Sequence, residues 1–324
     1  MDRLGLALLA IVGVPLVTCG YLVVGERLLN ELPPRVQRAI RPWLWLAPAI
    51  ALLGVFLVYP TIETIRVSLY GPSSQHFVGL ANYSYLASDA GLRLTIRNNL
   101  LWIVVFTAVT VALGLIIAVL TDRRRYENFA KAVVFLPMAV SFVGAGVIWK
   151  FVYDYQPAGA GQTGLLNAGL LATVPGFSPR AWLILDPINN LALIAVGVWV
   201  WTGFCTVILS AALKGLSREV LEAAKVDGAN AWQIFLLVTL PCIAPTIAVV
   251  TTTMVIFSLK AFDIVYVMTS GNFNTDVLAN RMYTEMFTND NFGRAAAIAV
   301  ILLVAIVPVM AINVRRFRRQ EEQN

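Results

Sequence analysis

Runs of about twenty apolar residues alternate with shorter polar segments along almost the whole chain. A transmembrane helix needs about 20 predominantly apolar residues to cross the hydrocarbon core of a bilayer. Seven stretches meet or nearly meet this length, at residues 4–24, 43–65, 98–120, 132–153, 191–213, 242–261 and 295–314. The pattern therefore predicts an all-α membrane protein, a polytopic bundle of about seven transmembrane helices.

The first apolar stretch, residues 4–24, could also be a cleaved signal peptide. Its leading segment holds only Arg3 against Asp2, and no clean small-x-small cleavage site follows the apolar run. Cys19 after Leu-Val-Thr is a poor lipoprotein cleavage site. We therefore predict that this stretch is retained, as an extra N-terminal helix before a core of six.

The composition indicates a protein that is solvated mainly by lipid. Of the 324 residues, 59% are hydrophobic and 13% are charged, and the mean hydropathy is +0.76. Soluble domains carry about 25% charged residues, so the length indicates one membrane bundle rather than two soluble domains. The three cysteines lie in apolar runs without disulfide or metal spacing, and we expect them to be small buried residues. The lone histidine, His76, lies in a polar loop and completes no metal or acid–base set.

Lysine and arginine gather in alternate loops, and this asymmetry sets the predicted orientation in the membrane. Fifteen of the 24 basic residues follow the first, third and fifth spans or lie in the C-terminal tail. They are Arg27, Arg35, Arg38, Arg41, Arg123, Arg124, Arg125, Lys131, Lys214, Arg218, Lys225, Arg315, Arg316, Arg318 and Arg319. We predict that the N-terminus is outside and the C-terminus is cytoplasmic, with residues 214–241 on the cytoplasmic side.

The segment between the fifth and sixth spans, residues 214–241, changes from a span pattern to a surface pattern. Ser217 can cap a first helix that ends at Gly228, where a left-handed residue is favoured. Asn230 can cap a second helix, with Gln233 in capping-box spacing and Pro241 at its expected end. The pattern predicts two short helices joined at a bend. On these features alone, an amphipathic connector at the lipid interface is an equally good interpretation.

The order of residues in this segment resembles the EAA motif of ABC importer permeases. The matching positions are Glu222, Ala223, Ala224, Asp227, Gly228, Ala229, Leu240 and Pro241. In that family the loop is the coupling helix, which docks in a cleft of a separate cytoplasmic ATPase. The resemblance implies that Glu222 meets a basic partner there, that Ala223 and Ala224 allow close approach, and that Gly228 holds the bend.

Other segments look like the carbohydrate branch of these permeases. They are FVGLANY (77–83), FLPMAVSFVGAGVIWKFVYD (135–154), GLLN (164–167), FDIVYVMTSGN (262–272) and FGRAAAIAVIL (292–302). The similarity covers roughly residues 43–320 and is strongest to maltose-, glycerol-phosphate- and α-glucoside-type first permease subunits, with NRMYTEMF (280–287) leaning towards the α-glucoside kind. It implies an N-terminal helix and basic cytoplasmic linker at residues 1–42, and a permease domain at 43–320.

The resemblance implies a permease subunit of an ATP-driven importer in a bacterial inner (plasma) membrane, with an oligosaccharide or α-glucoside as substrate. It implies three kinds of partner: a second homologous permease, two ATP-binding subunits and an extracytoplasmic solute-binding protein. The chain has no Walker-type signature, no HExxH and no nucleophile–base pairing. We therefore expect no enzyme activity, metal or cofactor in this chain, with ATP and Mg bound by the partner ATPase, and no nucleic-acid partner.

Aromatic and hydroxyl side chains of the fifth and sixth spans are candidates for the sugar pathway. Aligned from the EAA glutamate, their regions resemble those that hold sugar in maltose-type permeases. The candidates are Trp201, Thr202, Gly203, Thr206, Phe257 and Ser258. Thr202 and Thr206 are four residues apart and therefore share a helix face. The alternative is that the aromatic residues pack or form an interfacial belt, and that the threonines bond to their own backbone.

An ion-coupled secondary transporter of a small polar solute is the alternative function. It would need charged groups at mid-span and often shows repeated halves with broken helices, whereas the charges here cluster in loops and at span ends. Lys260 and Asp263, near the outer end of the sixth span, are interpreted as an intrahelical ion pair rather than a proton relay. A third class, an intramembrane enzyme, would need facing acids, a Ser/His pair or a metal set within the spans.

Overall fold

The computed structural model describes residues 3–321, except residues 123 and 158. Within these residues the chain is almost entirely helical, and the one extended pairing is an isolated bridge between Tyr70 and Phe77. The α-helices are α1 (Arg3–Asn30), α2 (Pro34–Leu53), α3 (Tyr59–Val67), α4 (Ala81–Ser88), α5 (Ala90–Leu101), α6 (Thr107–Thr121), α7 (Glu127–Phe135), α8 (Phe142–Val152), α9 (Leu165–Thr173), α10 (Ile188–Lys214), α11 (Arg218–Val226), α12 (Ala231–Gln233), α13 (Leu240–Leu259), α14 (Asp263–Met268), α15 (Leu278–Phe287) and α16 (Phe292–Glu321). Three π-helical turns, η1 (Gly54–Val58), η2 (Trp102–Phe106) and η4 (Ile234–Thr239), and one 3₁₀ turn, η3 (Leu136–Ala139), join some of them.

Five continuous helical segments of the described chain are long and apolar enough to cross a membrane. They are Pro34–Val67, Ala90–Thr121, Ile188–Lys214, Ala231–Leu259 and Phe292–Ala311. These segments confirm that the second, third, fifth, sixth and seventh predicted spans form long apolar helices. The first predicted span forms helix α1, but most side chains of its first half lie outside the described residues, so its role as a span stays a prediction.

The sequence suggested one straight helix for the fourth predicted span, but the structure has a bent pair of helices there. Helices α7 and η3 meet α8 at an angle of 100°. Pro137 lies in the 3₁₀ turn, and Val140 and Ser141 then take extended conformations, which interrupts the helical hydrogen bonding. Ser141 begins the next helix because its hydroxyl accepts a hydrogen bond from the backbone N–H of Gly144 (3.0 Å).

The chain divides into two compact units, Met1–Arg66 and Val67–Asn324. In the first unit α1 and α2 form a helical hairpin in which an ion pair joins Arg41 to Glu26 (2.8 Å). The predicted basic linker is therefore mostly helix, because only residues 31–33 separate α1 from α2. This division after Arg66 is one of compactness. The predicted start of the permease domain at residue 43 is a different boundary and stays a prediction.

Helix α10 is the centre of the second unit, and its side chains are largely buried against α6, α7, α8 and α13. Helix α6 approaches α10 closely, because a Cβ at Gly114 would lie 2.4 Å from the Cβ of Cys205. All three cysteines are free, and Cys205 is buried as predicted. Cys19 and Cys242 are exposed, so the expectation that all three are buried was wrong.

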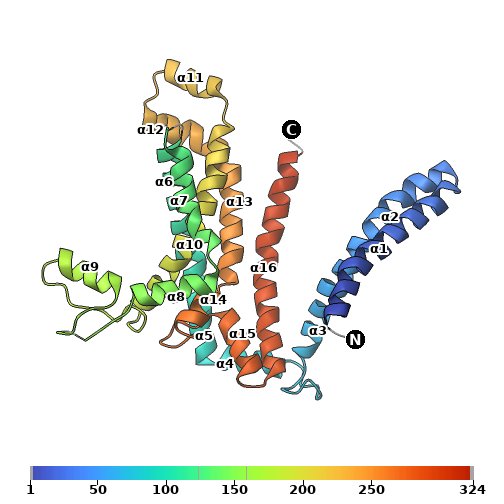
Figure 1. The fold of residues 1–324 in the computed structure, drawn as a ribbon, viewed down its shortest axis with the longest axis horizontal. Helices are drawn as coiled ribbons and strands as arrows, with labels where there is room; N and C mark the ends of the chain where they lie inside the picture. The colour runs from blue at the N-terminus through green and yellow to red at the C-terminus, as the bar shows by residue number, and fades with distance from the viewer. Residues whose placement is uncertain (1–2, 123, 158, 322–324) are drawn as a thin grey trace. The chain divides into compact units, whose positions relative to one another are not determined.

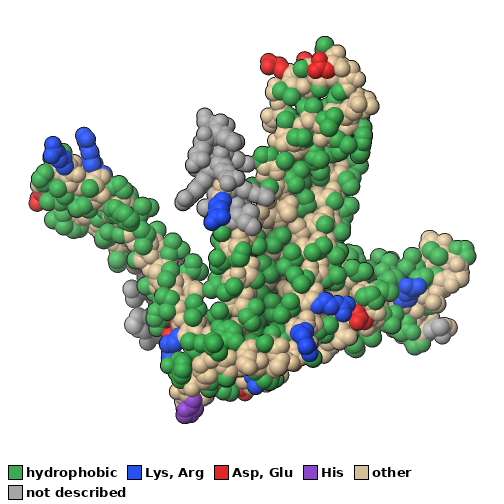
Figure 2. Space-filling model, turned by 180° about the vertical axis from the view of Figure 1, so that it is seen from behind, with side chains coloured by type: hydrophobic (Ala, Val, Ile, Leu, Met, Phe, Trp, Pro, Cys, Tyr) green, Lys and Arg blue, Asp and Glu red, His purple; other side chains and the backbone are tan. Residues whose placement is uncertain are grey.

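Different helices lie at the two ends of the second unit (Figure 1). Helices α11 and α12 and the C-terminal part of α16 lie towards one end, and α4, α8, α9 and α15 lie towards the other. Hydrophobic side chains cover most of the surface between these ends, and acidic side chains gather at the tip formed by α11 (Figure 2). Within the second unit, the loop 214–241 and the C-terminal helix end, both predicted to be cytoplasmic, thus lie towards the same end, although the sidedness itself stays a prediction.

At the end opposite α11, buried asparagines hold the loop between α14 and α15. The amide of Asn98 donates to the carbonyl oxygens of Asn274 (2.8 Å) and Asp276 (2.9 Å). The amide of Asn189 donates to the carbonyl oxygen of Phe273 (2.5 Å). Because Asn98 belongs to α5 and Asn189 to α10, the loop ties together the ends of two long helices.

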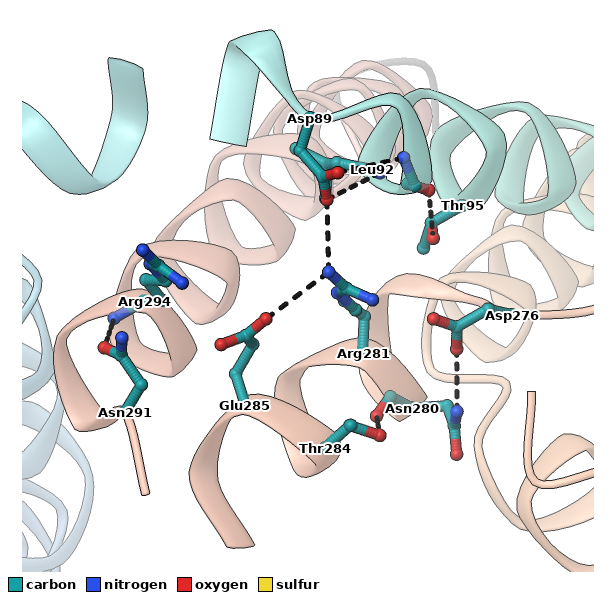
Figure 3. Close-up of polar contacts among 11 residues, drawn as sticks. Asp89, Leu92, Thr95, Asp276, Asn280, Arg281, Thr284, Glu285, Asn291 and Arg294 are labelled. Atoms are coloured by element: carbon teal, nitrogen blue, oxygen red, sulfur yellow. Dashed lines mark hydrogen bonds and ion pairs between the residues drawn. The ribbon is translucent and has the colours of Figure 1, made fainter. Parts of the chain in front are cut away.

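A charged network joins α5 to α15 at the same end (Figure 3). The carboxylate of Asp89 caps α5 by accepting from two backbone N–H groups, and it lies 3.1 Å from Nη2 of Arg281. The same nitrogen lies 3.4 Å from Oε1 of Glu285, whose side chain is buried. Burial raises the pKa of Asp276, although a hydrogen bond from Asn280 opposes this effect. These contacts fix the position of α15 beside α5.

Candidate functional site

The segment 214–241 forms the two short helices predicted from the sequence. Helix α11 begins after Ser217, which has the extended N-cap backbone but makes no side-chain cap hydrogen bond. At its end, the N–H of Ala229 donates to the carbonyl oxygen of Ala224 (3.0 Å), and that of Gly228 to Lys225 (3.0 Å). This pair of hydrogen bonds is a Schellman motif, and Gly228 supplies its left-handed residue with φ +82°. Gly228 therefore holds the bend, as predicted.

The second helix begins with the predicted capping box. The side chain of Asn230 accepts from the backbone N–H of Gln233 (2.9 Å), and the side chain of Gln233 accepts from the backbone N–H of Asn230 (2.9 Å). Two of the free N–H groups at the helix start are thus satisfied locally.

We expected the second helix to end at Pro241, but it continues beyond this residue. Helix α12 continues through the π-helical turn η4 into α13, so one segment runs from Ala231 to Leu259. Pro241 is accommodated because it lies in the first turn of α13, directly after the wider π-helical turn. Leu240 and Pro241 therefore belong to a long helix rather than to the tip of the loop.

Helix α11 presents most of its surface to the outside. It contains no buried residue, and Glu222, Ala223, Asp227 and Gly228 are exposed. Val226 is 87% exposed, which is unusual for an apolar side chain on a polar helix. Beneath α11 is a hollow of about 200 Å³, lined by Leu213, Leu216, Leu221, Ala231, Phe235 and others. A short helix without buried residues is open to contact with another protein.

A cavity of about 180 Å³ lies beside Trp201, where α10 meets η2, α8 and the junction of α13 and α14. Six of its twelve lining residues are aromatic: Trp102, Phe106, Phe142, Trp201, Phe257 and Phe262. The ring centroids of Trp201 and Phe257 are 3.8 Å apart, and those of Trp201 and Phe142 are 5.9 Å apart. Aromatic faces of this kind suit the C–H faces of a sugar ring.

The structure brings together three of the six predicted pathway residues. Trp201, Phe257 and Ser258 line the cavity. The hydroxyl of Thr202 donates to the carbonyl oxygen of Val198 (2.6 Å), and that of Thr206 to the carbonyl oxygen of Thr202 (2.9 Å). The alternative that the threonines bond to their own backbone is thus confirmed.

Gly203, the remaining candidate, is a packing position. A Cβ at this residue would lie 2.4 Å from the carbonyl oxygen of Val134 and 2.6 Å from the Cα of Phe135. Helices α10 and α7 are therefore in backbone contact here, and the space that a Gly203 side chain would occupy is filled by the backbone of α7.

Substituting Gly203 by alanine is expected to reduce the amount of folded protein. The added methyl group would meet backbone atoms of α7 that cannot rotate away, and such overpacking costs about 1–3 kcal/mol. Membrane abundance and the unfolding temperature in detergent measure the effect. Gly169→Ala is the control, because a Cβ at Gly169 has no atom within 4 Å. Equal stability of the two variants would contradict the packing role.

Sequence reasoning missed part of the cavity wall. Trp102 and Phe106 come from the third span, and Phe142 from the start of α8. The available signal was the spacing of Trp102 and Phe106, which are four residues apart and therefore share a helix face. Nothing in the sequence indicated that this face meets Trp201.

Lys260 and Asp263 do not form the intrahelical ion pair that we predicted. Helix α13 ends at Leu259 and α14 begins at Asp263, so the two charged residues lie on either side of a helix break. No ion pair in the described part of the chain includes either residue, and both line the aromatic cavity.

The family described as binding-protein-dependent transport system inner membrane component matches residues 110–320. The chain is 56% identical over 279 residues to the osmoprotective compounds uptake permease protein GgtC of Synechocystis sp., covering 86% of this chain and 99% of that protein. It is 50% identical over 287 residues to the alpha-glucoside transport system permease protein AglF of Rhizobium meliloti, covering 88% and 85%.

Solved structures show the same fold. One is a bacterial ABC transporter involved in the import of the acidic polysaccharide alginate, with a TM-score of 0.72 and 24% identity over 87% of this chain and 99% of that chain. A second is a bacterial alginate ABC transporter in complex with an alginate pentasaccharide-bound periplasmic protein, with a TM-score of 0.73 and 22% identity over 88% and 96%.

Proposed function

Since this chain belongs to the family of binding-protein-dependent transport system inner membrane components, it is a multi-pass permease subunit of an ABC importer. We propose that its substrate is a sugar of the α-glucoside class. Two relatives support this substrate class, because one is named for alpha-glucoside transport and the other for uptake of osmoprotective compounds. The aromatic wall around Trp201 supports it chemically, since aromatic faces stack on sugar rings.

The observation that carries the proposed mechanism is the connection between the exposed loop and the cavity. Helix α10 supplies Trp201 to the cavity, and α13 supplies Phe257 and Ser258. Helices α11 and α12 are the only covalent link between α10 and α13. A force applied to the loop therefore acts on both helices that carry the predicted pathway residues.

In the proposed mechanism, a separate ATPase binds α11 and moves it as a rigid body. ATP and Mg bind to that ATPase, and its closure would rotate α10 and α13 so that the cavity changes from inward-facing to outward-facing. The assembly would contain a second homologous permease, two ATP-binding subunits and a solute-binding protein on the outer side. Glu222, Ala223, Ala224, Asp227, Gly228 and Ala229 would form the coupling surface, with Leu240 and Pro241 supporting it from α13.

Co-purification tests this proposal directly. The chain is tagged, extracted in mild detergent and analysed by mass spectrometry for stoichiometric partners. We expect an ATPase and a second permease, and we expect the purified complex in liposomes to import maltose, sucrose or trehalose only with ATP and the binding protein. A lone chain that moves solute without ATP would overturn the proposal and favour the ion-coupled secondary transporter.

A further inference from the structure

Two charged side chains line the aromatic cavity at the junction of α13 and α14. Lys260 and Asp263 line it together with Trp201 and Phe257. We propose that Asp263 and Lys260 determine specificity for uncharged sugars, with the Asp263 carboxylate accepting from substrate hydroxyls and the Lys260 ammonium donating to them. This inference rests on the proposed function as a sugar permease.

The helix break makes both charges available to a ligand. Within one helix, residues three apart lie on the same face and can pair with each other. Here α13 stops at Leu259, and Phe262 takes a non-helical backbone conformation (φ −133°, ψ −60°) before α14 begins. At the end of α13, the backbone N–H of Lys260 donates to the carbonyl oxygen of Phe257 (3.1 Å). The side chains of Lys260 and Asp263 have no ion-pair partner in the described part of the chain.

Few other polar groups of the cavity wall are free to bind a solute. The hydroxyl of Ser258 donates to the carbonyl oxygen of Val255 (2.7 Å). The indole N–H of Trp102, a side chain that is 2% exposed, has no hydrogen-bond partner. The polar groups that remain on this wall are therefore the Asp263 carboxylate, the Lys260 ammonium and the indole N–H groups of Trp102 and Trp201. A carboxylate beside aromatic rings is costly unless donors reach it, so this wall is complementary to a ligand rich in hydroxyl groups.

The arrangement selects the charge and shape of the substrate. A sugar ring offers C–H faces to Trp201 and hydroxyls at its rim, and each hydroxyl can both donate to Asp263 and accept from Lys260. Because the two charges cancel, a neutral sugar keeps the cavity neutral. A uronate would add an uncompensated negative charge to this balanced pair, and its carboxylate would be repelled wherever it lies nearer to Asp263 than to Lys260. The volume of about 180 Å³ is below the about 300–1,000 Å³ of pockets for drug-sized ligands, so the cavity fits one ring.

The test measures binding to the complete purified complex in nanodiscs by saturation-transfer difference NMR, with methyl α-glucoside and methyl α-glucuronide as probes. The native complex is expected to prefer the glucoside. Asp263→Asn is expected to lower the glucoside-to-glucuronide affinity ratio by about tenfold or more, because it removes the negative charge and leaves Lys260. Lys260→Met is expected to weaken glucoside binding without increasing glucuronide binding. A purely structural role would weaken both probes equally.

Lys150→Met is the control, because Lys150 is an exposed charged residue of α8 outside the cavity wall. It should leave the glucoside-to-glucuronide affinity ratio unchanged. Asp263→Ser replaces Asp263→Asn if the asparagine variant does not assemble. An unchanged ratio in the Asp263 variants, or a native complex that imports sugar without preferring the glucoside, overturns this inference while the proposed function stands. A native complex that imports no maltose, sucrose or trehalose with ATP overturns the proposed function and this inference with it.

Discussion

Replacing Glu222 by lysine is expected to lower ATP-dependent uptake by more than about tenfold, because removing one partner from a desolvated interfacial ion pair costs about 2–5 kcal/mol. Glu222 is exposed on α11, a helix without buried residues, and it makes no ion pair in the described part of the chain. The substitution therefore removes no contact that holds the permease together. Uptake in proteoliposomes, normalised to the amount of permease in the membrane, measures the effect.

Glu219→Lys is the matched control for this prediction, because it makes the same charge change on the exposed surface of the same helix. We expect Glu219→Lys to retain more uptake than Glu222→Lys, and both variants to insert in normal amounts. Equal losses in the two variants would show that the overall charge of α11 matters rather than a contact of Glu222. Full uptake by Glu222→Lys would remove this side chain from the coupling surface.

The Gly228→Pro variant is expected to insert normally and to lose uptake by more than about tenfold, because proline fixes φ near −65° and removes the backbone N–H. Gly228 has φ +82°, and its N–H donates to the carbonyl oxygen of Lys225. Both features of the Schellman motif are therefore lost, and α11 can no longer keep its angle to α12. Since nothing lies within 4 Å of a Cβ at Gly228, the defect is in the bend rather than in packing.

Gly228→Asn separates conformation from side-chain size. Asparagine tolerates a positive φ better than other residues with a Cβ, and the space around Gly228 is open. We expect this variant to retain most of the uptake and the normal association with the ATPase. If Gly228→Asn is as inactive as Gly228→Pro, the surface of the loop at this position matters rather than its backbone angle.

Local sequence determined those features of this protein that depend on neighbouring residues. Hydropathy located five long apolar helices correctly, because a helix that can cross a bilayer requires only a sufficient run of apolar residues. The capping box at Asn230 and the left-handed end at Gly228 were predictable because all their hydrogen bonds join residues at most five positions apart. The prediction of eight coupling positions rests on a resemblance that lies within the same short segment.

Only the tertiary structure decided which side chains meet. The cavity wall combines residues from η2, α8, α10 and the α13–α14 junction, which are distant in the sequence. Gly203 proved to be a contact point with α7. Because the helix breaks after Leu259, Lys260 and Asp263 do not form the expected ion pair, and both line the cavity. A hydrophobic pattern specifies that a helix face is buried but not what covers it, because contacts between helices depend on the path of the whole chain.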